Sequence, residues 1–154
     1  MNEILERIKD AQRGSSKLSD MPTFNQALEE IKKGKKASHW IWYVFPTISG
    51  IYLSYTSEYF AFQNINDVHC FLEDSYLRNN LKMITQELLR LKANNAEDIL
   101  GEADSDKLHS SMTVFNEVSK HDIFQKVLEK FYHGKTHEKT LIILKTIIRN
   151  YNNR

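Results

Sequence analysis

Residues 38–46 have the sequence SHWIWYVFP, which places both tryptophans of the chain beside a histidine. Aromatic rings at this density either fill a core or form the wall of a pocket that stacks on a planar ligand. A histidine near a helix start can act as a general base or hold a phosphate, so His39 is a candidate catalytic residue. We expect Ser38, Trp40 and Trp42 to contact the ligand. Two alternatives stay open: His39 is a half-buried ring bonded to backbone, and one of the tryptophans, pointing away from the other on a helix, belongs to the core.

A second group of polar side chains lies in KLHSSMTVF at residues 107–115. Ser110, Ser111 and Thr113 place three hydroxyls in an otherwise apolar helical segment, where such groups bond either a ligand or the backbone. Ser111 follows Lys107 by four residues, so a hydroxyl and an ammonium share a helix face and can converge on one anionic group. We expect all four to bind the ligand. The alternative is that the hydroxyls allow close helix packing and bond the carbonyl four residues back.

Motifs for other chemistries are absent from the sequence. There is no GxSxG elbow, no HxH or HExxH spacing, no cysteine pair and no glycine-rich phosphate loop. His133 and His137 are four residues apart, but Gly134 between them disfavours the helix that would bring them together. We therefore expect neither a metal ion nor a cofactor.

The composition is that of a soluble globular protein. The chain has 154 residues, 41% of them hydrophobic and 27% charged, and 21 basic against 20 acidic residues give a net charge of +1. A near-neutral chain of this length predicts a single domain over residues 1–154 and no nucleic-acid partner. The lysines at 32–36 flank Gly34, and we expect them to mark a solvated helix end.

The single cysteine and the polar amino terminus indicate the cellular compartment of the protein. Cys70 cannot form an internal disulfide, and neither a signal-like nor a membrane-spanning apolar stretch is present. These features predict a cytoplasmic protein without a membrane partner.

Helical periodicity runs through most of the chain and predicts a mainly α, single compact domain of several helices. The expected helices lie over residues 4–14, from Pro22 to Gly34, over 76–93, around 108–118 with Asp104 or Ser105 as cap, from His121 or Asp122 to Gly134, and around 141–148.

The exception is residues 38–62, because HWIWYVF is apolar on all sides and fits either a buried helix or a central strand. Ser38 favours the helix as an N-cap. An α+β fold with a small sheet in this segment is the alternative.

Three segments in this order, SHWIWYVFP, KLHSSMTVF and FYHGKTHEKTL at 131–141, resemble the family called domain of unknown function 1810. The resemblance covers about residues 5–145 and implies a compact, mainly helical bacterial-type domain, without implying a function. Two single positions depart from the family pattern: Thr47 stands where the family usually has glutamine, and His137 where it has aspartate. The glycine-rich turn that commonly follows the proline is also reduced to Gly50-Ile51-Tyr52-Leu53. If those family residues are catalytic, this chain is impaired.

A fainter similarity is to the NADAR glycosidase family. It rests on Glu58-Tyr59-Phe60, followed by residues 107–112 on a helix and an aromatic pair before a glycine. This resemblance implies Glu58 as a catalytic residue and an ADP-ribose-like N-glycosidic bond as substrate.

These observations predict a pocket with His39, Trp40 and Trp42 as its wall and Lys107, Ser110 and Ser111 as its floor. The expected ligand is an anionic, nucleotide-like small molecule, since aromatic stacking and charge-assisted bonds suit such compounds. Hydrolysis of that ligand is a further expectation, with Glu58 or His39 as acid or base. The alternative is a non-enzymatic module that binds another protein, with the aromatic run as its core.

Overall fold

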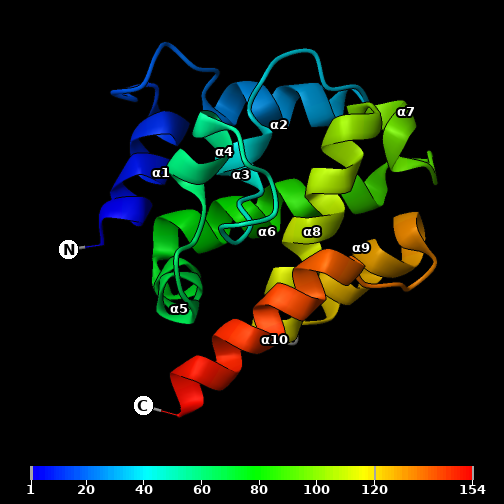
Figure 1. The fold of residues 1–154 in the computed structure, drawn as a ribbon. Helices are drawn as coiled ribbons and strands as arrows, with labels where there is room; N and C mark the ends of the chain where they lie inside the picture. Colours follow the sequence, from blue (N-terminus) through cyan, green and yellow to red (C-terminus); the bar gives the residue numbers. More distant parts are fainter. Residues whose placement is uncertain (1, 120, 154) are drawn as a thin grey trace.

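The computed structural model describes residues 2–119 and 121–153, which form a mainly helical single domain (Figure 1). Its helices are α1 (Glu3–Arg13), α2 (Phe24–Lys32), α3 (Ile41–Val44), α4 (Tyr55–Phe60), α5 (Ile65–Glu73), α6 (Ser75–Arg90), α7 (Ala96–Leu100), α8 (Glu102–Ser119), α9 (Asp122–Tyr132) and α10 (Glu138–Asn152). None of the described helices is both long and apolar enough to cross a bilayer.

Local signals place several helix ends where the sequence predicts them. Thr23 accepts a hydrogen bond from the Gln26 backbone, and the Gln26 side chain accepts one from the Thr23 backbone, which makes a capping box for α2. α1 ends at Gly14, whose φ of 87° is in the left-handed region that glycine adopts without strain. α9 begins after His121, as expected.

The core gathers around α8, which packs against α3, α5, α7, α9 and α10. Figure 1 shows α10 crossing α8, which it contacts together with α5. At the centre, the Phe115 ring of α8 lies 5.9 Å from Phe62, 5.3 Å from Phe71 and 5.5 Å from Phe124, measured between ring centroids. These four buried rings join α5, α8 and α9 with the segment after α4.

Residues 38–62 form no sheet, so the α+β alternative is wrong. The strand-like feature of the described chain is one isolated parallel bridge between Ile48 and Phe62. Ser38 is not the N-cap of α3 either: Trp40 holds that position, and no side chain caps the helix.

Other boundaries differ for identifiable reasons. α8 begins at Glu102, directly after Gly101 with φ 84°, so Asp104 and Ser105 lie inside the helix and do not cap it. α6 ends at Arg90 and not at residue 93: the backbone of Leu91 is extended, with ψ 147°, and the Lys130 ammonium donates to the carbonyls of the last turn. The helices α5 and α7 were not expected from periodicity.

Candidate functional site

Glu30 of α2 organises the first part of the aromatic run. One of its carboxylate oxygens accepts from the Ala37 N–H (2.7 Å), the Ser38 N–H (3.0 Å) and the Trp40 indole N–H (2.8 Å). The other accepts from the Ser38 hydroxyl (2.5 Å). Burial alone would raise the pKa of Glu30, but these bonds outweigh it and hold the pKa below its usual value. Glu30 therefore remains an anion that anchors this segment.

This anchoring corrects the expected pocket wall. Trp40 is 0% exposed and its only polar atom is bonded to Glu30, so it belongs to the core and offers no face to a ligand. Ser38 is bound to the same carboxylate. His39 lies exposed at the surface and does not line the hollow described next.

Trp42, two residues on, lines a small enclosed hollow of about 20 Å³. Its lining residues are Ile41, Trp42, Phe45, Thr47, Tyr52, Ser57, Ala61 and Lys107. The Lys107 ammonium lies 5.9 Å from the Trp42 ring centroid and 5.5 Å from that of Tyr52, within cation–π range. Among the described residues, the buried Trp42 indole N–H has no hydrogen-bond partner. The packing of α3 on α8 therefore joins Trp42 and Lys107, as the sequence predicted.

Lys107 belongs to a group of three charged side chains at the hollow, together with Asp104 and Lys36. The Asp104 carboxylate lies 3.3 Å from the Lys107 ammonium and 2.7 Å from that of Lys36. Two ammoniums thus share one carboxylate. The side chain of Lys36 is only 6% exposed, so its expected place at a solvated helix end is wrong: Asp104 draws it inward.

Hydroxyl groups connect the hollow to α10. The Thr47 hydroxyl lies 2.6 Å from the Ser110 hydroxyl, which lies 2.6 Å from that of Thr140. The Thr140 hydroxyl is 2.8 Å from His137 Nδ1. Ser110 is fully buried in this row and contacts Thr47, which lines the hollow.

His137 continues the row to the surface. Its Nδ1 accepts from the Thr140 N–H (3.3 Å) as the N-cap of α10, so the proton lies on Nε2, which donates to Asp106 (3.1 Å). Asp106 also accepts from the Tyr52 hydroxyl (2.5 Å). Burial first, and then the bond to Asp106, raise the pKa of Tyr52 well above its usual value. Tyr52 therefore stays a protonated donor at the rim of the hollow.

The other two hydroxyls of residues 107–115, those of Ser111 and Thr113, do not reach this hollow. Thr113 is fully buried, donates to the His109 carbonyl (2.8 Å) and accepts from the His137 N–H (2.9 Å). Thr113 therefore has the alternative role considered above, in which a hydroxyl donates to the carbonyl four residues before it. Ser111 is also fully buried, and its hydroxyl has no partner within the described chain.

Glu58 has a structural task. Its carboxylate accepts from the Ser49 hydroxyl and from the Gly50 N–H (2.9 Å), and so it fastens the turn after Pro46. It does not line the hollow.

Sequence reasoning missed a neighbouring surface cavity of about 610 Å³ on α7, α8 and α9. There the His109 ring stacks on Tyr132, with 4.0 Å between centroids and 3° between planes. Burial lowers the pKa of His109, so the ring is neutral in the physiological range. The spacing of Asp106 and His109 is typical of one helix face, but only the packing of α9 supplies Tyr132.

The family model described as protein of unknown function (DUF1810) matches residues 2–144 of the chain. The chain belongs to this family. Among solved structures, the conserved hypothetical protein Rv1873 from Mycobacterium tuberculosis is similar, with 27% identity and a TM-score of 0.85 over 93% of this chain and 97% of that one. No curated protein matches.

The geometry gives structural roles to Thr47 and His137, the two single positions at which this chain departs from the DUF1810 pattern. His137 caps α10, a task that the expected aspartate performs equally well. Thr47 bonds Ser110 beside the hollow, so the departure at 47 changes the lining of the hollow while the departure at 137 preserves a helix end.

Proposed function

We propose that this protein binds a small molecule and that the hollow beside Trp42, Tyr52 and Lys107 takes an anionic group of it. The observation that carries the proposal is the Trp42 N–H, which is buried without an acceptor in the described structure, beside an ammonium. A buried donor left unpaired costs about 1–3 kcal/mol, so a ligand oxygen at this place is stabilised.

The size of the hollow limits what enters it. About 20 Å³ admits one water-sized group, and therefore an oxygen of a carboxylate or phosphate but not a whole nucleotide. The rest of the ligand lies outside, against the loop that carries Tyr52 and the exposed Leu53. The partly buried Trp42 ring favours a planar, nucleotide-like body.

No catalytic step is part of the proposal. Hydrolysis of an ADP-ribose-like N-glycosidic bond needs an acid or base at the hollow. The two candidates are elsewhere: His39 is exposed outside it, and Glu58 is engaged by Ser49 and Gly50.

Ligand titration followed by thermal unfolding tests the proposal, with inorganic phosphate, ADP-ribose and NAD as probes. We expect at least one of them to raise the unfolding temperature, because a ligand that binds only the folded state stabilises it. The rise is lost in Lys107→Met and in Trp42→Phe, while the exposed Lys145→Met on α10 serves as the matched control. Binding that survives both site variants, or stabilisation by none of the probes, would contradict the proposal.

The interaction-module alternative has one observation in its favour. Leu53 on the loop and Tyr55, the first residue of α4, are 81% and 72% exposed, and a partner protein would bury them. In that case Leu53→Asp abolishes co-purification of a partner, and no probe shifts the unfolding temperature.

A further inference from the structure

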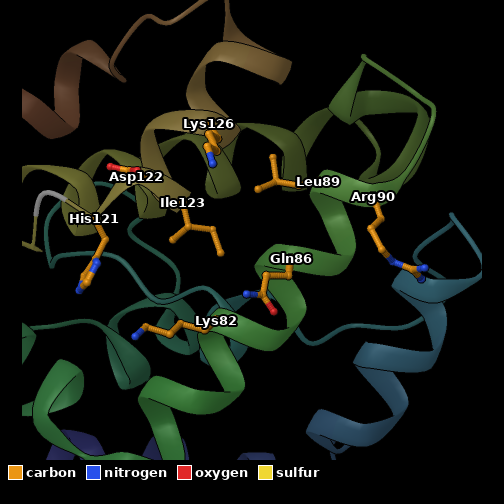
Figure 2. Close-up of a pocket in the computed structure, with 8 residues that line it drawn as sticks. All are labelled: Lys82, Gln86, Leu89, Arg90, His121, Asp122, Ile123 and Lys126. Atoms are coloured by element: carbon orange, nitrogen blue, oxygen red, sulfur yellow. The ribbon is translucent and has the colours of Figure 1, made fainter.

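A further concave surface lies between α6 and α9 (Figure 2). This groove has a volume of about 660 Å³. It is lined by Lys82, Gln86, Leu89 and Arg90 from α6 and by His121, Asp122, Ile123 and Lys126 from the start of α9.

The groove is more basic than the chain as a whole. It holds three cationic side chains and one carboxylate, on a chain whose net charge is only +1. Arg90 is paired with Glu87 at 2.5 Å and extends away from the other side chains in Figure 2. Lys82 and Lys126 form no ion pair with any described residue, so their charge is available to a ligand.

The groove also has apolar surface beside the charge. Leu89 and Ile123, both partly buried, lie on opposite walls. An enclosed hole of about 70 Å³ adjoins the groove, shares Lys82 and His121 with it, and is lined further by Leu72, Arg78, Leu81, Ser119 and Phe124. A mostly apolar hole lined by the unpaired Lys82, in a groove that also holds Lys126, suits a ligand that is both apolar and anionic.

The two walls are fixed to each other. The Lys130 ammonium of α9 donates to the carbonyls of Leu88 (3.5 Å), Leu89 (2.9 Å) and Leu91 at the end of α6. These bonds satisfy carbonyls that a helix end leaves free. The groove is therefore present before any ligand arrives, which lowers the entropy cost of binding.

We propose that this groove is a binding site for small amphipathic anions. The carboxylate or phosphate lies between Lys82 and Lys126, and the hydrocarbon part covers Leu89 and Ile123 and enters the adjoining hole. The N-terminus of α9, which has no side-chain cap, adds backbone donors on the same side. This site is separate from the hollow at Trp42 and does not depend on it.

Amide chemical shifts measured by NMR during titration test the site, with hexanoate, hexyl phosphate and the neutral hexanamide as probes. We expect the two anions to shift the signals of Lys82, Gln86, Ile123 and Lys126, and hexanamide to leave them unchanged. Stronger binding of one anion identifies the head group as a carboxylate or a phosphate ester. Added salt should weaken binding, since the lysines are accessible to solvent.

Variants decide whether the lysines carry the binding. The double variant Lys82→Met, Lys126→Met retains the apolar stems and should weaken hexanoate binding by about tenfold or more. Lys145→Met is the matched control. Trp42→Phe tests the independence of the two sites: it alters the hollow and should leave hexanoate binding in the groove unchanged, because the two share no lining residue. Equal shifts from hexanamide, an unchanged affinity in the double variant, or no shift from any probe would overturn the proposal.

Discussion

At the scale of single residues, the two tryptophans show how near neighbours in sequence take different roles. α3 is only one turn long and begins at Ile41, so Trp40 precedes it and donates to Glu30, while Trp42 lies on it beside Lys107. The sequence predicted that one ring belongs to the core, but the choice between them depends on a carboxylate from another helix.

We expect Trp40→Ala to lower the free energy of unfolding by about 3–5 kcal/mol, because it opens a cavity and removes one of the hydrogen-bond donors to Glu30. Trp42→Ala should cost clearly less, since that ring is only partly buried and its N–H is unpaired. Urea unfolding of both variants measures the difference. Equal losses of stability would contradict the division between core and site.

At the scale of elements, helix ends matter as much as helix faces. α10 begins at a histidine, an uncommon N-cap, because its Nδ1 accepts the Thr140 N–H while its Nε2 donates to Asp106. The cap therefore joins the start of α10 to α8, and through Thr140 to the hydroxyl row behind the hollow.

His137→Ala should destabilise the protein by about 0.5–2 kcal/mol, the usual cost of losing an N-cap side chain. His137→Asn should restore most of that loss, since asparagine caps a helix and adds no charge beside Asp106. Thermal unfolding of the two variants makes the comparison. If the Asn variant is as unstable as the Ala variant, the cap is not what His137 contributes.

At the scale of the whole molecule, two carboxylates tie together segments that are distant in sequence. Glu30 holds α2 to the segment before α3, and Asp74 pairs with Lys9 of α1 while capping α6. Burial alone would raise the pKa of Asp74, but the bonds from Lys9 and the Leu77 N–H lower it below its usual value.

This arrangement predicts the direction of the acid response. Because the folded pKa of each carboxyl lies below its unfolded value, 4.5 for Glu30 and 3.8 for Asp74, the stabilisation is complete above those values. It is lost as the pH falls through the lowered folded pKa values. The double variant Glu30→Gln, Asp74→Asn should therefore show a flatter decline of unfolding free energy with acid in urea unfolding at several pH values. A decline as steep as that of the unsubstituted protein would refute this assignment.

The sequence by itself determined the helical class and several helix ends, because periodicity and glycine stops act over a few residues, and the resemblance of three motifs indicated the family. Gly14, which stops α1, is an example. Residues 38–62 were ambiguous, since an apolar run has no periodicity and its conformation depends on what surrounds it.

Only the tertiary structure decided which of the expected site residues face a hollow. Lys107 and Trp42 meet there, whereas Trp40, Ser111 and Thr113 are buried away from it. The physical reason is that burial and hydrogen-bond partners come from other helices: Glu30 takes the Trp40 N–H, and Asp104 sets the charge around Lys107. The spacing of neighbouring residues does not predict these contacts, because they join residues that are distant in sequence and are brought together by helix packing.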